Sequence, residues 1–502
     1  LCGLEKYFGS GLVKGIGPKF SKLIVAKFGM DTFDIIEKDS QQLGEVDGIG
    51  PKRIKKIHDS WMKQLDIKDV MVFLQGNGVS TAYAAKIYKT YGKESIDKVK
   101  ANPYCLADDI WGIGFKTADS IAEKMGYGKN DERRCRSGIL YTLNQLANEG
   151  HVYANRDQLV DAGVKLLEAE KTAIESALDK MIADEDLKIE DEAIYLPPFY
   201  FSEVGTANKL KTLLTTRQQN MFEKEPDIAA ISKKTGITYD DLQAEAIRTA
   251  VHNKVMVLTG GPGTGKTTTE DGIIAAFKEM GLHILLAAPT GRAAKRMTEA
   301  TGMEAKTIHR LLEFNPAEGY KRNDENPLEG DALIIDECSM IDIVLMNYLL
   351  KAVPSDMRLL LVGDVDQLPS VGAGNVLRDI IDSGVVPVVR LTRIFRQAQT
   401  SRIIMNAHAI NEGRMPDIRN GKQSDFFFME CEEPDQIAST IVDLVSHRLP
   451  KAYNIPRSSI QVLTPMQRSV IGANNLNISI QQRVTPTGNG LTRAGFTFRK
   501  GD

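Results

Sequence analysis

The sequence predicts a multidomain protein in which an all-α N-terminal region precedes a larger α/β region. Short glycine-containing turns between helical patterns recur through residues 1–130. From residue 238 onward, apolar runs such as KVMVLTG, HILLAAPT, DALIIDE and RLLLVGD alternate with helical patterns. Continuous apolar strands separated by helices are typical of a parallel sheet that carries helices on both faces. The length of 502 residues suits roughly three or four domains of ordinary size.

The composition excludes several classes of protein. Apolar residues make up 42% of the chain and charged residues 26%, which is ordinary for a globular protein and excludes wholesale disorder, collagen-like repeats and small disulfide scaffolds. The five cysteines form no CxxC pair, so we expect free thiols in a reducing cytosol and no zinc site. No run of roughly 18 apolar residues is present, so no membrane span is predicted.

The net charge of −3 is unevenly distributed. Residues 1–130 carry 20 Lys and Arg against 16 Asp and Glu, so the remainder of the chain is acidic. A net charge near zero argues against a wholly electrostatic, histone-like DNA-binding protein and leaves room for a narrow basic track. Neither end looks natural, because the chain begins without Met, shows no signal peptide and stops in a strand-like FTFRKGD. We therefore expect part of a longer chain.

The glycine turns of the N-terminal region form a repeat. GIG occurs at Gly15–Gly17, Gly48–Gly50 and Gly112–Gly114, and a looser GNG at Gly76–Gly78, each between an apolar segment and a helical pattern. Four helix-hairpin-helix units are predicted, paired one with two and three with four. Outward amides in such turns suit a phosphate oxygen, but these units also serve as spacers between proteins. KRIKK (Lys52–Lys56) is a candidate phosphate track or simply a solvated helix face.

Residues 131–235 read as amphipathic helices with a few short strands. GHVYANRDQLVDAG predicts a strand followed by a helix, and EDEAIYLPPFYFSE predicts a β-hairpin that ends at Pro197–Pro198. A small winged-helix-like module fits this order. No chemistry is visible in the segment, so we interpret it as a structural connector.

A phosphate-binding loop is predicted at GGPGTGKT, Gly260–Thr267, which matches GxxxxGK[ST]. It follows an apolar strand and precedes the helical TTTEDGIIAAFKEMG, as the mechanism requires. Glycines let successive amides close around the β-phosphate, Lys266 reaches the β/γ oxygens, and the Thr267 hydroxyl ligates Mg²⁺. ATP with Mg²⁺ is therefore the expected ligand. The residues expected to line its site are Gly261, Pro262, Gly263, Thr264, Gly265, Lys266, Thr267 and Thr268.

Two later strand ends supply the remaining catalytic candidates. LIIDE places Asp336 for the magnesium shell and Glu337 beside the γ-phosphate, where it can polarise the attacking water. LLLVGDVDQLPSVGAG places Gln367 in the loop after another strand. Taken alone Gln367 is a turn residue, but beside the other motifs we expect it to bond the γ-phosphate or the water.

The motifs occur in one order: DLQAEAIRTAV, LTGGPGTGKTTT, AAPTGRAAKRMTE, KTIHRLL, LIIDECSMID, GDVDQLPSVGAGNVL and LTRIFRQAQTSRI. With this set the chain resembles superfamily 1 DNA helicases, most closely the RecD-like branch with N-terminal helix-hairpin-helix units. The resemblance implies that Gln243 reads the adenine edge, that Phe395 lies near the base, and that Arg396 is an arginine finger from a second motor domain. A guanidinium suits transition-state phosphoryl charge, although RIFR can equally form a surface salt bridge.

The same resemblance implies a DNA-binding set. Thr290, Gly291, Arg292 and His309 would lie along single-stranded DNA, although His309 can equally be a core histidine. The polar, turn-rich segment 311–331 fits a β-hairpin, which in the family acts as a pin that splits the duplex. A plain surface loop is the alternative.

The expected organisation follows from these motifs. It comprises a duplicated helix-hairpin-helix region (1–130), a helical, winged-helix-like connector (131–235), an α/β RecA-like P-loop motor domain (236–390) and a partial second RecA-like domain (391–502). Two motifs that the resemblance calls for after LTPMQRSVIGANNLN, one of them carrying a second arginine, do not occur. Part of the second motor domain is therefore expected to be absent from this chain.

The expected function is that of a cytoplasmic, monomeric, ATP-dependent DNA helicase. It would move 5′ to 3′ on single-stranded DNA and open single/double-strand junctions in repair or recombination. The alternative is a DNA-binding clamp or scaffold whose ATPase acts as a switch without processive unwinding. A conjugative relaxase-helicase is disfavoured, because no His-rich metal cluster or catalytic Tyr pair precedes the motor.

Overall fold

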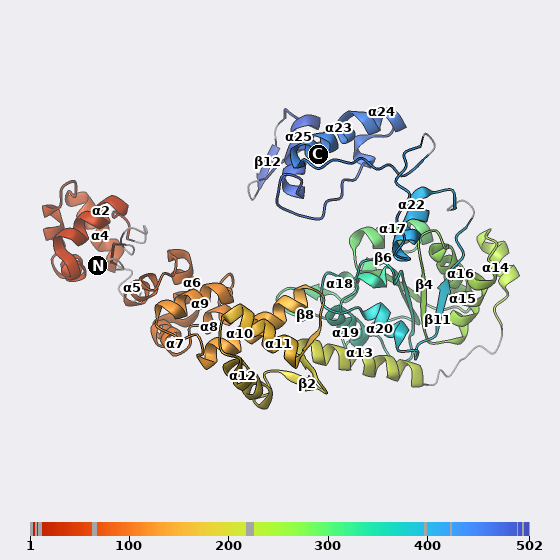
Figure 1. The fold of residues 1–502 in the computed structure, drawn as a ribbon, viewed down its shortest axis with the longest axis horizontal. Helices are drawn as coiled ribbons and strands as arrows, with labels where there is room; N and C mark the ends of the chain where they lie inside the picture. The colour runs from red at the N-terminus through yellow and green to blue at the C-terminus, as the bar shows by residue number, and fades with distance from the viewer. Residues whose placement is uncertain are drawn as a thin grey trace. The chain divides into compact units, whose positions relative to one another are not determined.

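The computed structural model of the chain describes residues 4–5, 8, 13–62, 68–216, 225–395, 399–421, 424–488, 490–493 and 496–500. It divides into two compact units, residues 1–393 and 394–502. Figure 1 shows the order of the elements along the chain. None of the helices in the described ranges is long and apolar enough to cross a bilayer.

The N-terminal part of the first unit is built from short helices, as the glycine repeat predicts. They surround a core that includes Phe8, Trp61 and Tyr104, all fully buried. Their bounds are α2 (Pro18–Phe28), η1 (Gly29–Asp31), α3 (Thr32–Lys38), η2 (Ser40–Glu45), α4 (Pro51–Met62), α5 (Lys68–Gly76), α6 (Thr81–Tyr91), η3 (Gly92–Glu94), α7 (Ser95–Ala101), α8 (Cys105–Asp109) and α9 (Phe115–Lys124).

All four predicted hairpin turns are present, but the third lies two residues later than the GNG at 76–78 suggests. In each turn one glycine has a positive φ: Gly15 (110°), Gly48 (86°), Gly78 (83°) and Gly112 (96°). Each is followed by a buried Ile or Val and then by the residue that precedes the next helix. The third turn is therefore Gly78-Val79-Ser80. Its last position needs no glycine, because Ser80 caps α6 with its own hydroxyl.

The turns are paired as predicted, one with two and three with four. A Cβ on Gly15 would lie 3.0 Å from Ile57 of α4, and one on Gly48 would lie 3.2 Å from Phe20 of α2. In the second pair, Gly112 lies against Tyr83 of α6, whose hydroxyl donates to the Gly112 carbonyl at 2.6 Å. In both pairs a turn glycine thus contacts a side chain from the helix that follows its partner turn.

The connector contains a small sheet with strand order β1-β3-β2. The strand that feeds a helix and the hairpin that ends before Pro197 are both present. A Cβ on Gly205 of α13 (Pro197–Thr215) would lie 2.4 Å from the side-chain amide of Asn347, so this helix packs closely against the motor region. The bounds are α10 (Glu132–Asn148), β1 (Tyr153–Asn155), α11 (Arg156–Leu167), α12 (Lys171–Ala183), β2 (Lys188–Glu190), β3 (Ala193–Tyr195) and α13 (Pro197–Thr215).

The predicted parallel sheet forms the rest of the first unit. Its strand order is β11-β4-β10-β9-β5-β6, and every neighbouring pair is parallel. The strands are β4 (Val255–Gly260), β5 (Ile284–Ala288), β6 (Ala305–Thr307), β9 (Ala332–Ile335), β10 (Arg358–Gly363) and β11 (Val388–Leu391). The connecting helices are α14 (Ile228–Thr235), α15 (Asp241–His252), α16 (Lys266–Glu279), α17 (Gly291–Thr301), α18 (Ile308–Leu311), η4 (Cys338–Met340), α19 (Ile343–Ala352) and α20 (Val376–Asp382).

Helices cover both faces of this sheet, so its central strands β4, β9 and β10 are buried throughout. Along β4, Val255 and Val257 join the apolar cluster that includes α19, whereas Met256 and Leu258 join the cluster that includes α15 and α16. This burial explains why the strands read as continuous apolar runs.

The segment 311–331 holds a very short hairpin. Its strands β7 (Phe314–Asn315) and β8 (Gly319–Tyr320) are antiparallel. The residues after β8 turn back to the body, where Asp324 accepts a hydrogen bond from Lys209 of α13 at 3.3 Å. Only the exposed turn at 316–318 extends beyond the strands.

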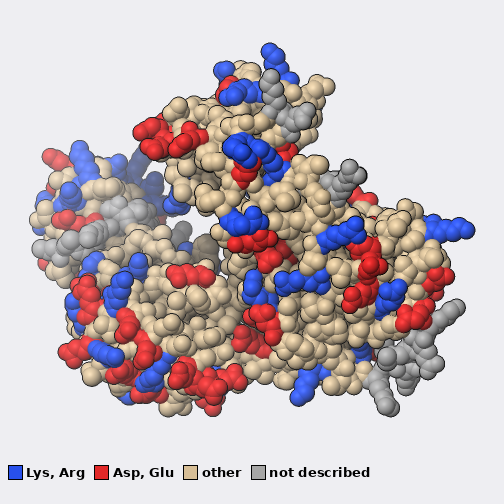
Figure 2. Space-filling model, turned by 45° about the vertical axis from the view of Figure 1, so that its right-hand side comes forward, with Lys and Arg blue, Asp and Glu red and all other residues tan. Residues whose placement is uncertain are grey.

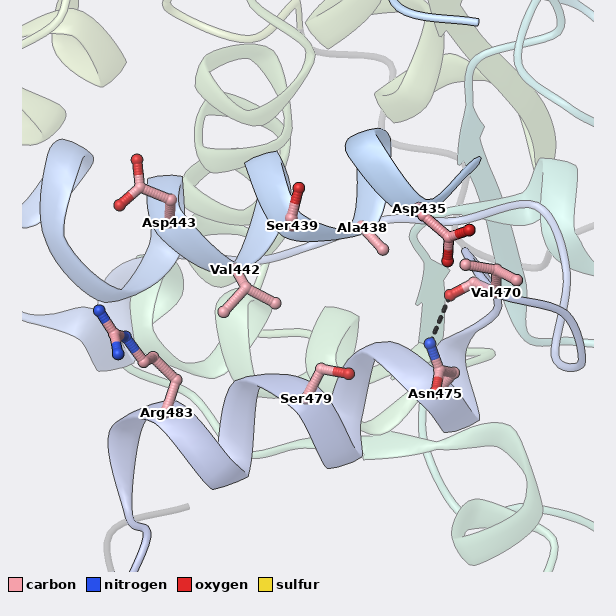
Figure 3. Close-up of a pocket in the computed structure, with 9 residues that line it drawn as sticks. All are labelled: Asp435, Ala438, Ser439, Val442, Asp443, Val470, Asn475, Ser479 and Arg483. Carbon is pink, nitrogen blue, oxygen red and sulfur yellow. Dashed lines mark hydrogen bonds between the residues drawn. The ribbon is translucent and has the colours of Figure 1, made fainter. Parts of the chain in front are cut away.

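The second unit buries few of its apolar side chains. Among its described residues, Ala409, Ala438, Val445 and Leu476 are buried, and Leu463 is 88% exposed. A groove of about 410 Å³ lies between α23 and α25, with Val442 and Val470 in its lining (Figure 3). The elements are α22 (Arg402–Asn411), α23 (Pro434–Asp443), η5 (Leu444–Arg448), α24 (Leu449–Tyr453), η6 (Arg457–Ser459), α25 (Ala473–Val484), β12 (Gly490–Arg493) and β13 (Phe496–Arg499).

Candidate active site

The phosphate-binding loop has the strand–loop–helix setting that its sequence predicts. The fully buried β4 leads into it, and α16 begins at Lys266. Gly263 and Gly265 have φ values of +75° and +82°, which side chains rarely adopt. The Thr264 hydroxyl donates to the Gly261 carbonyl at 2.8 Å and braces the loop. A Cβ at Gly260 would lie 2.7 Å from the Leu391 carbonyl, so this glycine is needed for packing.

The Lys266 side chain lies at this loop. Its ammonium donates to the carbonyls of Gly260 and Gly261 and lies 3.8 Å from the carboxylate of Asp364. Asp364 is buried at the end of β10 and also accepts from the Asp366 amide at 3.1 Å. The lysine is therefore held at the carboxyl edge of the sheet, where ligands bind in folds of this kind.

Asp336 and Glu337 follow β9, which lies between β5 and β10 in the sheet. Glu337 has a left-handed backbone with φ +56°, and its amide donates to Asp336 Oδ1 at 2.7 Å. Burial raises the pKa of both carboxyls, and the charge of Asp336 raises the pKa of Glu337 further. The nearby charges of Lys266 and Arg296 act in the opposite direction. A left-handed backbone at a half-buried acid is typical of a functional position.

Sequence reasoning missed one acid in this site. Glu270 on α16 is 3% exposed, and its Oε1 has no hydrogen-bond partner among the described residues. Burial, followed by the charges of Asp336 and Asp271, raises the pKa of Glu270 well above its usual value. The available signal was a charge within an apolar helix face, because Glu270 lies three, four and seven residues before Ile273, Ile274 and Phe277.

Gln243, expected at the adenine edge, lies in the first turn of α15. Its Oε1 accepts from the Asp240 amide at 3.1 Å, while the Asp240 side chain accepts from the Gln243 amide at 2.9 Å. This capping box fixes the side chain. The Gln243 Nε2 is buried with no partner in the described part of the chain, which leaves a donor suited to a base edge.

The three remaining residues expected at the nucleotide are not placed at the phosphate-binding loop by any described contact. Gln367 is exposed in the loop after β10, and its backbone N–H donates to the backbone carbonyl of Asp364 at 3.2 Å. Phe395 lies at the start of the second unit. Arg396 lies outside the described residues. The roles of Gln367, Phe395 and Arg396 therefore stay predictions.

The predicted DNA-binding residues follow two neighbouring strands. Because β5 pairs with β6 in parallel, with Ala288 opposite Thr307, the residues after both strands share one edge of the sheet. Thr290 caps α17 by accepting from the Ala293 amide at 3.2 Å, and Gly291 and Arg292 are exposed. His309 is exposed on α18, with its ring centroid 5.6 Å from that of Phe314. The core-histidine interpretation is therefore wrong, and contact with DNA stays a prediction.

Comparisons with known proteins match the chain region by region. Residues 12–63 match a SAM-like helix-hairpin-helix tandem, residues 63–153 the helix-hairpin-helix domain of the ATP-dependent RecD2 DNA helicase, and residues 243–373 an AAA domain. Among solved structures, the Pif1 helicase from Candida albicans aligns at 21% identity over 43% of this chain and 55% of that chain, with a TM-score of 0.30.

Two curated relatives are similar to different lengths of the chain. The RecBCD enzyme subunit RecD of Haemophilus influenzae is 40% identical over 35% of this chain and 31% of that protein. The ATP-dependent RecD2 DNA helicase of Deinococcus radiodurans is 32% identical over 100% of this chain and 70% of that protein. The resemblance to long RecD-like helicases is thereby confirmed, and the chain belongs to the RecD2 DNA helicase family.

Proposed function

We propose that this chain is an ATP-dependent DNA helicase that couples ATP hydrolysis to movement along single-stranded DNA and to strand separation. One observation carries the proposal: the nucleotide residues and the DNA candidates share the carboxyl edge of one parallel sheet. Lys266 follows β4, Asp336 and Glu337 follow β9, and Thr290 follows the adjacent β5. Movement of the residues that bind ATP can therefore displace the residues that would bind DNA, because both sets follow neighbouring strands.

Hydrolysis would use the acids and the lysine of this edge. Lys266 already lies at the loop carbonyls and would exchange these contacts for phosphate oxygens. Glu337 would orient the attacking water and take its proton, and its raised pKa brings this carboxylate closer to the neutral range that suits a general base. Gln367, in the loop after β10, would hydrogen-bond to the γ-phosphate or to the attacking water. Arg396 would add positive charge from the second unit.

Magnesium fits the residues of this site. The Thr267 hydroxyl at the start of α16 and the Asp336 carboxylate after β9 are oxygen donors of the kind that Mg²⁺ prefers. When bound, the ion would neutralise charge on the phosphates. Thr267 and Asp336 would hold it.

The DNA path would run past Thr290, Gly291, Arg292 and His309. On the face shown in Figure 2, basic and acidic side chains are interspersed, which favours a narrow track over a broad basic surface. We further propose movement from 5′ to 3′, action at single/double-strand junctions in repair or recombination, and work as a cytoplasmic monomer.

A duplex carrying a single-stranded tail tests this function. We expect DNA-stimulated ATP hydrolysis by the full-length protein and unwinding of a duplex with a 5′ tail in preference to one with a 3′ tail. DNA-stimulated hydrolysis without strand separation on either substrate would instead favour a DNA clamp with an ATPase switch.

A further inference from the structure

Glu270 is a buried carboxyl that the proposed hydrolysis does not use. It lies on α16 three residues after Thr267, so both residues lie on the same side of the helix. Only 3% of Glu270 is exposed, and its Oε1 receives no hydrogen bond from the described residues. Such an oxygen is expensive to bury without a partner.

The groups around Glu270 do not compensate its charge. The charges of Asp336 and Asp271 raise its pKa, so they repel the ionised form. Lys266, whose charge lowers the pKa of the neighbouring Asp336, donates to two loop carbonyls and lies beside Asp364. A buried acid that is repelled by neighbouring acids would be compensated by a positive charge or by a hydrogen-bond donor that a ligand supplies.

We propose that Glu270 belongs to the outer shell of the divalent-cation site formed by Thr267 and Asp336, where it accepts a hydrogen bond from a water bound to the cation. This inference rests on the proposed function. In this role Glu270 contacts the cation only through the water and adds no direct ligand to Thr267 and Asp336. Outer-shell acceptors of this kind orient the ligands and raise metal affinity.

Binding of Mn²⁺ to the ADP-loaded protein, followed by electron paramagnetic resonance, tests the inference without any turnover. Glu270→Gln keeps the shape of the side chain and removes its charge. We expect the Kd for Mn²⁺ to rise about 10- to 100-fold in this variant. Affinity for ADP without metal should stay within about twofold, because Glu270 would not touch the nucleotide.

Asp271→Asn is the matched control. Asp271 is the next residue on α16, is half-buried and has a pKa raised chiefly by burial. We expect this variant to bind Mn²⁺ at least as tightly as the wild type, because the lost Asp271 charge had disfavoured the ionised form of Glu270. A Glu270→Gln protein that also binds Mn²⁺ like the wild type would overturn the inference, because a protonated, merely structural glutamic acid is replaced by glutamine without loss.

A melting experiment checks the folding of the variant. Without metal, Glu270→Gln should melt at or above the wild-type Tm, because an uncompensated buried acid is removed. The rise in Tm produced by Mg²⁺ and ADP should be smaller than in the wild type.

If Thr267→Ala abolishes Mn²⁺ binding and Glu270→Gln does not change it, the outer-shell role fails and the cation site stands. If the wild type itself binds no Mn²⁺ with ADP, the proposed function fails as well.

Discussion

The Lys266 ammonium lies 3.8 Å from the Asp364 carboxylate, and this contact joins the first turn of α16 to the end of β10. The ion pair holds the lysine at the mouth of the phosphate-binding loop. The Lys266 side chain is 20% exposed, so it remains accessible to a ligand.

Replacing Lys266 by Ala should stop ATP hydrolysis and leave the fold intact. The phosphates would lose a charged donor, so we expect a fall in DNA-stimulated turnover of about 10²–10³-fold or more. The protein should still unfold cooperatively, with a Tm at or somewhat below that of the wild type, because the buried Asp364 loses its ion-pair partner. Lys278→Ala is the control, because Lys278 is an exposed lysine near the other end of α16. A Lys266→Ala protein with most of its turnover would contradict the phosphate-loop assignment.

Glu337→Gln should bind ATP but hydrolyse it about 10²–10⁴ times more slowly, because the proposed base is lost. Single-turnover hydrolysis with radiolabelled ATP separates the two effects. Loss of nucleotide binding with normal turnover of the bound fraction would show that Glu337 is not the base.

The pH dependence of hydrolysis should also reflect Glu337. Burial and Asp336 raise its pKa above the usual 4.5, and the base is active only when it is deprotonated. Activity should therefore be lost as the pH falls through this raised pKa, above pH 4.5, and recover when the pH rises again. A rate that stays constant down to pH 4.5 in a protein that remains folded would contradict this role.

The lysines of α4 should contribute to DNA affinity if the first hairpin pair follows a phosphate track. Lys52, Lys55 and Lys56 are exposed, whereas Arg53 lies 4.4 Å from the centre of the Phe20 ring and donates to the Gly48 carbonyl. Arg53 therefore belongs to the packing of the hairpins. Neutralising only the three lysines should reduce the slope of log affinity against log salt by about 0.7 for each lost contact on single strands.

The control for this experiment neutralises three exposed lysines outside the hairpins, Lys165, Lys171 and Lys278. Salt titrations of a fluorescent oligonucleotide compare the two triple variants. Equal slopes in both variants and the wild type would favour a spacer or protein-binding role for the hairpin pair.

Gly112→Ala should destabilise the second hairpin pair. Gly112 has φ +96°, and its Cβ position has space, with the nearest atom of Tyr83 at 3.5 Å. The cost would come from the backbone and should be about 1–2 kcal/mol in the free energy of unfolding. Gly114→Ala is the control, because Gly114 has φ −94° and no heavy atom lies within 4 Å of the place that a Cβ would take. Similar urea midpoints for the two variants would refute the backbone argument.

The sequence alone predicted those features whose conformation depends on residues close together in the chain. The phosphate-binding loop, the acids after β9 and the order of strands and helices could be predicted, because glycine conformations, helix starts and apolar strand runs depend on neighbouring residues. The third hairpin was predicted two residues out of place. Local glycine spacing did not reveal that Ser80 caps the helix where the other turns have glycine.

Tertiary structure decided which side chains are buried and what they meet. Arg53 reads as part of a charge run, yet it stacks on Phe20 from another hairpin. Glu270 reads as a polar residue of α16, yet the packing of that helix on the sheet buries it near Asp336. His309 could be assigned to the surface only once α18 was placed beside β7. Desolvation and charge–charge energies depend on distances between residues remote in sequence, so only the folded chain determines them.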